Sequence, residues 1–216
     1  MISHKHKYIY IHIPKTGGNS IEVALLENEG IDPERCKDEA GLTKAERQEY
    51  RLWYTYGEID VQHRKLGEYK KWREKEYFTF SFVRNPWDRI VSEYFYIKKN
   101  HKDAEEFNKL FPTFRDFVME DALSKWCNYA HDFQQIEFIL NANEHKLVDF
   151  VGKCETLQDD FDYVCRKLNL GFMDLKRTNQ TVHTHYSTYY DFETKMAVGK
   201  KYKADIQFFN YEFEQL

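Results

Sequence analysis

Length, composition and charge limit the classes of protein to which this chain can belong. Its 216 residues suit one domain with a substantial core, so we expect a single domain over 1–216. Lys and Arg number 32 against 36 Asp and Glu, and the net charge of −4 argues against a general nucleic-acid-binding protein. No stretch approaches the roughly 18 apolar residues of a membrane span, and the opening MISHKHK lacks the apolar core of a signal peptide. We therefore expect a cytoplasmic protein without a membrane span.

The cysteines and histidines show no pattern typical of a metal site. The four cysteines are widely spaced and form no C-x-x-C pair: Cys36, Cys127, Cys154 and Cys165. Reduced thiols in a cytosolic chain are the simplest interpretation. Two histidines lie two residues apart at His183 and His185, but no nearby cysteine pair completes a zinc pattern, so we expect no metal.

The stretch from Tyr8 to Glu22, YIYIHIPKTGGNSIE, carries the first clear signal. Residues rich in Ile and Tyr predict a buried strand, the pair Gly17-Gly18 predicts a tight turn, and an apolar-periodic run from Ile21 predicts a helix. The first N–H groups of such a helix have no carbonyl partner, and with the helix dipole they form an anion site suited to phosphate. Lys15 adds a positive charge, and Thr16 and Ser20 add hydroxyl donors.

The next part of the chain gives weaker signals. Asn19–Glu29 predicts a helix that ends near Gly30, and a short helix is possible over Lys44–Leu52 within a polar region. His63 follows a short apolar alternation and precedes an expected helix over Leu66–Trp72. A lone histidine in a polar stretch is usually a surface residue, although one at the end of an element can also act as a general base.

A second landmark covers Tyr77 to Ile97, YFTFSFVRNPWDRIVSEYFYI. Alternating phenylalanines predict another buried strand, Asn85 can cap the following helix, and Pro86 suits its first position. Arg84 lies where the strand ends, which is where α/β proteins bind ligands. Together with Ser92 it could bind one phosphate, because the planar guanidinium donates in pairs. The alternative is a structural ion pair for Arg84 and a surface position for Ser92.

The remainder of the chain completes an α/β pattern. We expect a charged connector over His101–Phe111, a third buried strand over Leu147–Val151 and a polar loop over Met173–Tyr190. Helices are expected over Phe114–Glu120, Phe133–Leu140, Leu157–Leu168, Thr188–Val198 and Lys200–Phe209. Three strand-then-helix units predict an α/β fold with a central parallel sheet flanked by helices.

The phosphate turn does not match the common nucleotide-binding motifs. A nucleoside triphosphatase would show G-x-x-x-x-G-K-S or G-K-T, whereas here Lys15 precedes the glycines. The dinucleotide pattern G-x-G-x-x-G is absent as well, because Gly17 and Gly18 are adjacent. A turn for one phosphate and a second anion site on Arg84 and Ser92 fit a ligand with two separated phosphates better than a triphosphate.

IPKTGGNSIE and FVRNPWDRIVSEYFY resemble the paired signatures of the carbohydrate sulfotransferases, which include heparan sulfate and chondroitin sulfotransferases. The resemblance continues through DVQHRKLGEYKKW, DFVGKCETLQDDFDYVC, LKRTNQT…YSTYYDFET and DIQFFNYEF. It covers most of the chain and is weakest over Ile31–Thr55 and His101–His131. Two departures from the family's pattern are Cys154, where an aromatic residue is expected, and Asn19, where Thr or Ser is commoner. Neither removes a charge or donor that the chemistry needs.

The resemblance implies a fold, a donor and a set of roles. The fold would be a P-loop-like three-layer arrangement, and the donor would be 3′-phosphoadenosine 5′-phosphosulfate (PAPS), with 3′-phosphoadenosine 5′-phosphate (PAP) as product and no metal. His63 matches the histidine that family members use as general base, and Arg84 and Ser92 match the residues that bind the 3′-phosphate. The 5′-phosphosulfate would be bound by Lys15, Thr16, Gly17, Gly18, Asn19 and Ser20. A loop closing over the donor would contribute Arg177, Asn179 and Thr181.

The resemblance leaves the acceptor and two rival functions open. A hydroxyl-bearing carbohydrate or glycoconjugate is the expected partner, although the many aromatic residues that would suit sugar stacking are equally explained by core packing. One rival is a kinase or nucleotide hydrolase on a degenerate P-loop. The other is a non-catalytic module that binds phosphonucleotides. The sequence does not indicate an oligomeric state.

Overall fold

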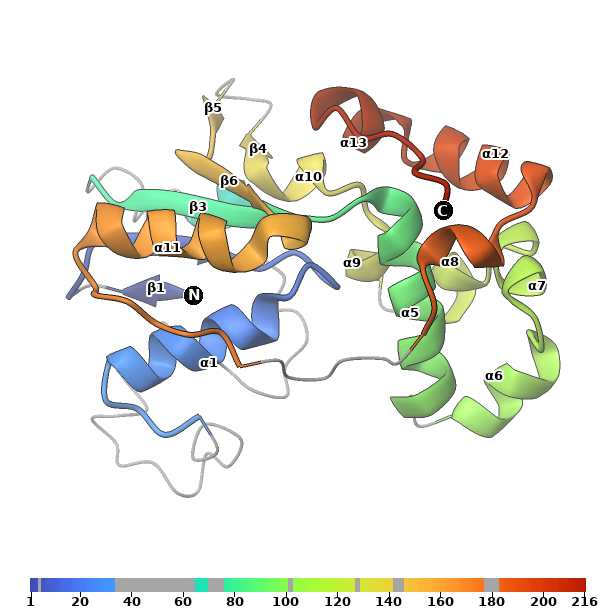
Figure 1. Ribbon diagram of the computed structural model, residues 1–216, viewed down its shortest axis with the longest axis horizontal. Helices are drawn as coiled ribbons and strands as arrows, with labels where there is room; N and C mark the ends of the chain where they lie inside the picture. The colour runs from blue at the N-terminus through green and yellow to red at the C-terminus, as the bar shows by residue number, and fades with distance from the viewer. Residues whose placement is uncertain are drawn as a thin grey trace. The chain divides into compact units, whose positions relative to one another are not determined.

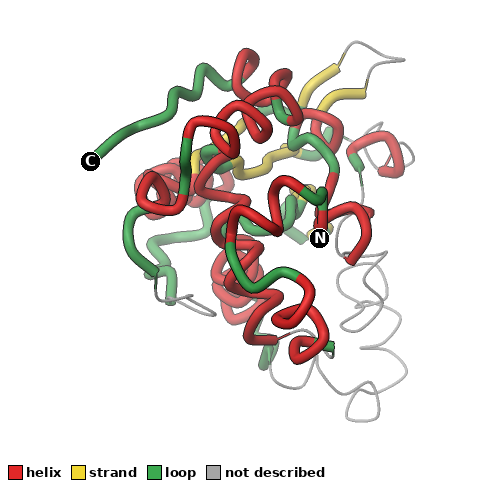
Figure 2. The backbone as a smooth tube through the Cα atoms, turned by 90° about the vertical axis from the view of Figure 1, so that its right-hand side faces the viewer, coloured by secondary structure: helices red, strands yellow, loops and turns green. Residues whose placement is uncertain are grey.

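The computed structural model describes residues 1–3, 5–33, 65–69, 76–100, 103–126, 129–141, 146–176 and 183–216. The chain divides into two compact units, each made of two segments. Unit 1 comprises Met1–Val83 and Glu137–Thr178, and unit 2 comprises Arg84–Ile136 and Asn179–Leu216. The described backbone is richer in helix than in strand (Figure 2).

Unit 1 is built on a four-stranded sheet with the order β1-β2-β3-β6. β2 and β3 are parallel, as are β3 and β6, whereas β1 runs antiparallel to β2. The strands are β1 (Ile2–Ser3), β2 (Tyr8–Ile11), β3 (Phe78–Val83) and β6 (Phe150–Lys153). A separate antiparallel pair joins β4 (Leu140–Asn141) to β5 (Lys146–Leu147). The described part of the unit also includes the 3₁₀ helices η3 (Leu66–Tyr69) and η4 (Cys154–Thr156). The α/β class and the parallel pairing of β2, β3 and β6 are as expected, whereas the antiparallel strand β1 and the antiparallel β4–β5 pair were not expected.

Two helices of unit 1, α1 (Gly18–Asn28) and α11 (Leu157–Leu168), pack on the sheet (Figure 1). Because successive side chains of a strand point to opposite faces, four aromatic side chains of β2 and β3 point into the same core. Within it, the rings of Tyr10 and Phe80 stack with 5.1 Å between their centroids. The same core contains Ile21 and Leu25 of α1 and Phe161 and Val164 of α11. This packing fixes the start of α1 at the end of β2, where the glycine turn lies.

Unit 2 is helical in the ranges that the structure describes. Its helices are α5 (Pro86–Asn100), α6 (Ala104–Leu110), α7 (Phe114–Met119), α8 (Ala122–Trp126), α9 (Tyr129–Asp132), η5 (Tyr186–Tyr189), α12 (Phe192–Lys201) and α13 (Lys203–Phe208). A four-residue helix, α10 (Ile136–Ile139), begins at its boundary with unit 1. Aromatic residues dominate the core: the Tyr94 ring lies 5.6 Å from Phe114 and 5.3 Å from Phe117. The high aromatic content of the chain is therefore used largely for packing.

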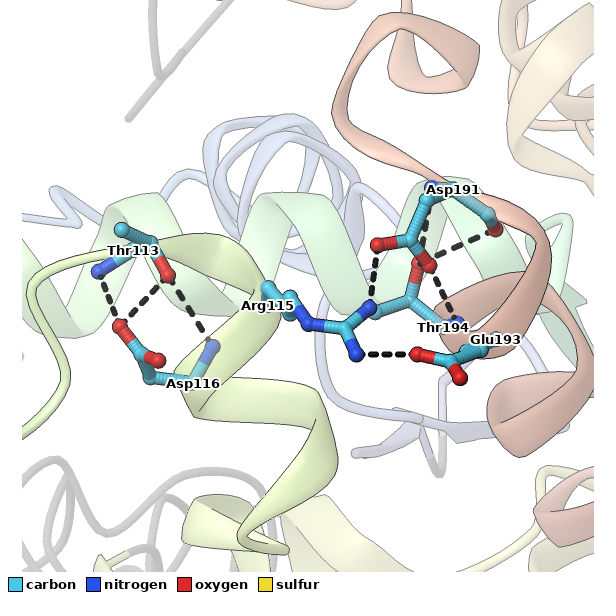
Figure 3. Close-up of polar contacts among 6 residues, drawn as sticks. All are labelled: Thr113, Arg115, Asp116, Asp191, Glu193 and Thr194. Carbon is cyan, nitrogen blue, oxygen red and sulfur yellow. Dashed lines mark hydrogen bonds and ion pairs between the residues drawn. The ribbon is translucent and has the colours of Figure 1, made fainter.

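Arg115 connects two capped helix starts in unit 2 (Figure 3). A capping box formed by Thr113 and Asp116 begins α7, and a second one formed by Asp191 and Thr194 begins α12. From α7, Arg115 pairs with Asp191 at 2.5 Å and also with Glu193. Both helices thus start from locally determined caps and are joined by one arginine.

Several expected elements differ from the structure. The charged connector expected over His101–Phe111 contains α6, so that expectation was wrong. The helix expected over Phe133–Leu140 is limited to α10. It begins after Gln135, whose backbone N–H donates to the side chain of Asp205. The strand expected over Leu147–Val151 is split between β5 and β6. The possible helix over Lys44–Leu52 lies outside the described residues.

The helix expected over Thr188–Val198 instead covers Phe192–Lys201, because its capping box begins at Asp191, and the loop expected over Met173–Tyr190 contains η5. The remaining helices are closer to expectation. α1 begins one residue before Asn19, and its end is fixed by Gly30 N–H and Ile31 N–H, which donate to the carbonyls of Glu27 and Leu26. Asn85 Oδ1 accepts from Trp87 N–H at 3.1 Å and Pro86 is the first residue of α5, as the sequence predicts. No helix in the described ranges is long and apolar enough to cross a membrane.

Candidate functional site

The turn between β2 and α1 has a backbone shaped for an anion. The φ angle is positive at Lys15 (67°) and Gly17 (84°) but not at Thr16 between them, and Gly17 caps α1 without a side-chain hydrogen bond. Alternating φ signs turn successive N–H groups toward one side, which makes a concave anion site. The start of an 11-residue helix adds its dipole to the same place. Lys15 contributes its charge from within the turn.

Thr16 stabilises this turn rather than offering its hydroxyl proton to a ligand. Its side chain is completely buried, and Oγ1 donates to the carbonyl of Ile13 at 2.9 Å. The bond closes the turn across three residues. Thr16 can therefore bind an anion through its backbone N–H, and not through the hydroxyl that the sequence suggests as a donor.

A buried histidine packs against the start of α1. His12 and Glu22 are both almost fully buried, and Nδ1 of His12 lies 2.9 Å from Oε1 of Glu22. Gly18 lies directly against the imidazole, because a Cβ there would be 2.1 Å from Nε2. The ring thus fills the space between the first turn of α1 and a carboxylate one turn further along. This contact locks the helix start onto the end of the sheet.

The start of α11 packs on the other glycine of the turn. A Cβ at Gly17 would lie 2.8 Å from Cδ2 of Leu157 and 3.7 Å from Sγ of Cys154. Position 17 therefore needs a residue without a side chain for two reasons, its left-handed backbone and its close neighbours. Cys154, one of the two departures from the motif that the sequence resembles, therefore lies beside this turn.

Tyr10 completes the buried layer beneath the turn. Its ring stacks beside His12 at 5.9 Å, and its hydroxyl is buried without a hydrogen-bond partner in the described part of the chain. Burial, and then the negative charge of Glu22, raise the pKa of Tyr10 well above its ordinary value. Tyr10 is therefore a neutral phenol whose place in the layer is set by packing.

The second predicted anion site follows β3 directly. Arg84 is the first residue of unit 2, and its Nε donates to Oδ2 of Asp88 at 2.8 Å. Asp88 and Ser92 are four residues apart on α5 and so share a face, which places Ser92 one turn beyond the carboxylate that orients Arg84. Arg84 therefore makes the ion pair that one interpretation expected, and its partner lies on the same helix face as Ser92. Ser92 is buried rather than on the surface.

The backbone of Arg84 is held by one side chain. Gln135 accepts from Arg84 N–H through Oε1 at 2.8 Å and donates from Nε2 to the Arg84 carbonyl at 2.8 Å. Asp205 of α13 in turn accepts from the backbone N–H of Gln135 at 2.8 Å and of Ile136 at 2.9 Å. Burial raises the pKa of Asp205 above its ordinary value, although these N–H donors and Arg89 act in the opposite direction.

The structure brings together part of the predicted site. Lys15, Thr16, Gly17, Gly18, Asn19 and Ser20 form one continuous turn and helix start in unit 1. Arg84 and Ser92 belong to unit 2. His63 and the loop residues Arg177, Asn179 and Thr181 lie outside the described residues. No group of three or more His, Cys, Asp or Glu side chains within the described ranges is placed to hold a metal ion.

Four residues that support the candidate site do not stand out in the sequence motifs. His12 and Glu22 could have been found, because a histidine on the core-facing side of a strand and a glutamate on the apolar face of a helix are unusual. Gln135 and Asp205 carry no local signal, since they meet only through contacts across 70 residues. Their burial contradicts what polarity alone would suggest.

Comparison with known proteins identifies the family of this chain. One relative is an uncharacterized protein of Archaeoglobus fulgidus, which is 38% identical to this chain over 94 residues. The match covers 44% of this chain and 69% of that protein. The model of a family described as the sulfotransferase family matches residues 1–212 and so extends over both units. The chain therefore belongs to the sulfotransferase family.

Proposed function

We propose that the protein transfers a sulfuryl group from 3′-phosphoadenosine 5′-phosphosulfate to an acceptor hydroxyl. The observation that carries the proposal is the Lys15–Gly18 turn, whose alternating φ angles and position at the start of α1 suit a terminal phosphate or phosphosulfate. Family membership supports the reaction type, because sulfotransferases use a sulfate donor. We include a P-loop-like three-layer fold, a single functional domain and a cytoplasmic location in the proposal.

Each half of the donor would be bound by a different set of residues. The turn residues through Ser20 would bind the 5′-phosphosulfate, while Arg84 and Ser92 would bind the 3′-phosphate. The second assignment is supported by the hydrogen bond from Arg84 to Asp88, because Asp88 and Ser92 share a face of α5. Arg177, Asn179 and Thr181 would close over the bound donor.

The transfer then requires a base for the proton of the acceptor hydroxyl and stabilisation of the negative charge on the departing phosphate. An acceptor oxygen forms a bond to sulfur as the bond from sulfur to the bridging phosphate oxygen breaks, by analogy with phosphoryl transfer. His63 takes the acceptor proton, and the electron pair of the broken bond stays on the phosphate. Lys15 and the N–H groups of the turn stabilise that charge, an effect worth about 3 kcal/mol per donor. PAP leaves as the product.

The acceptor would be a carbohydrate or glycoconjugate hydroxyl. The basis for this part is the resemblance of the two motifs to carbohydrate sulfotransferases. A panel of saccharides, glycolipids and tyrosyl peptides, incubated with donor carrying radiolabelled sulfate, would identify the acceptor class. Transfer to peptides alone would contradict a carbohydrate acceptor.

The decisive test of the donor compares two nucleotides. Adenosine 3′,5′-bisphosphate should bind wild type more tightly than adenosine 5′-monophosphate, and Arg84→Ala should remove that difference with little loss of monophosphate affinity. Isothermal titration calorimetry measures both constants. Equal losses for both ligands would exclude Arg84 as the 3′-phosphate ligand. Magnesium-dependent release of the γ-phosphate of ATP, without sulfate transfer, would instead favour a nucleotide hydrolase.

A further inference from the structure

The backbone at Arg84 is paired by a side chain in the way that a strand would pair it. Both polar groups of the Gln135 amide are used: Oε1 accepts from Arg84 N–H and Nε2 donates to the Arg84 carbonyl, each at 2.8 Å. Two bonds to one residue fix its position and also the orientation of its peptide planes. The arginine that follows β3 therefore starts from a defined backbone.

The amide itself has little freedom to move. Gln135 is fully buried, and Asp205, also fully buried, accepts from its backbone N–H at 2.8 Å and lies 3.4 Å from its Nε2. The same carboxylate accepts from Ile136 N–H at 2.9 Å. Because a buried polar group left without a partner is costly, this set of bonds strongly favours one arrangement.

The segment before Gln135 is held by α5, the helix that Arg84 precedes. Arg89, which is almost fully buried, donates to the carbonyls of Phe133 at 3.0 Å and His131 at 2.9 Å. The segment is thus bound to α5 through Arg89 and to α13 through Asp205. It presents the Gln135 amide to Arg84 from a rigid support.

The side chain of Arg84 is oriented separately from its backbone. Its Nε donates to Asp88 at 2.8 Å, four residues along the chain. A guanidinium binds a phosphate well only when its planar fork is already aimed, since ordering it on binding costs affinity. With the backbone fixed by Gln135 and the guanidinium by Asp88, both ends of the arginine are set before a ligand arrives.

We infer that Gln135, supported by Asp205, is a positioning residue that presets Arg84 for the 3′-phosphate of the donor and so determines the preference for a 3′,5′-bisphosphate. This inference rests on the proposed function in taking Arg84 as the 3′-phosphate ligand. Gln135 acts through the backbone of Arg84 and does not itself touch the donor.

The test measures ligand preference rather than stability alone. Gln135→Met keeps the size of the side chain and removes both bonds to Arg84. We expect the dissociation constant of adenosine 3′,5′-bisphosphate to rise about tenfold, the effect of one charge-assisted hydrogen bond, and that of the 5′-monophosphate to change less than about twofold. Gln134→Ala is the matched control, because the Gln134 amide oxygen accepts from Ala204 N–H on the same α13. It should leave the preference unchanged.

A double-mutant cycle separates positioning from general damage. If Gln135 acts through Arg84, Gln135→Met in an Arg84→Ala background should not weaken bisphosphate binding further. Additional weakening in that background, or equal weakening of both nucleotides in the single variant, would overturn the inference. Should Gln135→Met fail to fold, Asp205→Asn takes its place in every arm: it weakens the acceptor that holds Gln135, so the same changes are expected at smaller size.

A second readout does not depend on the donor. Hydrogen exchange at the Arg84 amide, followed by NMR, should be faster in Gln135→Met than in wild type and unchanged in Gln134→Ala. If wild type shows no preference for the bisphosphate, the proposed function fails and exchange alone decides whether Gln135 fixes Arg84. Unchanged exchange at Arg84 in Gln135→Met would overturn the positioning role.

Discussion

Gly18 and the imidazole of His12 occupy adjoining space so completely that a Cβ at position 18 would lie 2.1 Å from Nε2 and 2.2 Å from Cδ2. The histidine is buried and hydrogen-bonded to Glu22, so it cannot move aside cheaply. The first residue of α1 is therefore limited to glycine by a side chain from the end of β2.

Gly18→Ala should destabilise the protein by about 1–3 kcal/mol, the usual cost of forcing an added group into a packed site. Chemical denaturation measures the change. Gly199→Ala provides the control: its Cβ would lie 3.4 Å from Trp87 Cζ2, and alanine favours the helix by up to about 1 kcal/mol. A Gly18→Ala protein as stable as wild type would show that His12 moves freely.

Glu22 and Glu27 lie on the same helix and should respond differently to truncation. Glu22 is buried against His12 at 2.9 Å, whereas Glu27 pairs at the surface with Lys176 at 2.6 Å. Glu22→Ala removes a hydrogen bond from a buried polar ring and should cost about 2 kcal/mol or more. Glu27→Ala should cost less than about 1 kcal/mol, because exposed ion pairs contribute little. Similar losses of unfolding free energy in both variants would contradict the buried pair.

Thr16→Val tests whether the turn must be closed to bind an anion. Valine has the shape of threonine but cannot donate to the Ile13 carbonyl, which then loses a partner at a cost of about 1–3 kcal/mol. We expect weaker binding of adenosine 5′-monophosphate in calorimetry. Thr16→Ser keeps the hydroxyl and should bind nearly as wild type. Wild-type affinity in Thr16→Val would show that the turn is stable without this bond.

Lys15 and His63 carry the two chemical roles of the proposed function. Lys15→Ala and His63→Ala should each lower the rate of sulfate transfer at least about a hundredfold, since one removes charge stabilisation and the other the general base. Lys5→Ala is the control, because Lys5 is an exposed lysine whose ion pair, with Glu29 at 3.6 Å, has no role in the proposed chemistry. Near-normal transfer by His63→Ala would remove that residue from the base role.

The cap of α12 should be visible in a pH titration. Hydrogen bonds from the backbone and side chain of Thr194, together with Arg115, lower the pKa of Asp191 from 3.8 to about 2. Because this pKa is lower in the folded state, the unfolded chain takes up the proton first, and the stabilisation is lost as pH falls from about 4 toward 2.

Carboxyl NMR shifts give the pKa of Asp191 directly. In Arg115→Ala it should rise but stay below its ordinary value, because the larger contribution from the Thr194 N–H remains. A return to the ordinary value in that variant would show that Arg115, and not the capping box, sets the titration.

The sequence predicted the elements whose cause is local. The β2–turn–α1 and β3–α5 units follow from alternation, glycine placement and the Asn85-Pro86 cap, all visible within about 15 residues. α6 was missed because it buries a single residue, Phe107, so its hydrophobic pattern has no periodicity to detect. The candidate anion residues were predictable for the same local reason as the turn.

Long-range polar contacts could not be predicted from the sequence. Gln135 and Asp205 can be buried because distant backbone groups satisfy their side chains, those of Arg84 for Gln135 and those of Gln135 and Ile136 for Asp205. Hydropathy assigns both residues to the surface. The split of the expected third strand between β5 and β6 has a similar cause: Asp149 leaves the strand to bond Thr79 N–H and Oγ1, each at 2.7 Å.

Lys15 has a left-handed backbone, which lowers the stability of the protein, and a side chain that the proposed activity needs. A non-glycine residue with φ of 67° costs about 1–2 kcal/mol relative to an ordinary conformation, a cost that glycine would escape. Replacing this lysine with glycine would relieve the strain and, on the proposed function, remove the positive charge that the donor requires. Selection for a more stable protein alone would thus favour an inactive one, and screens for thermostable variants need an activity readout at this position.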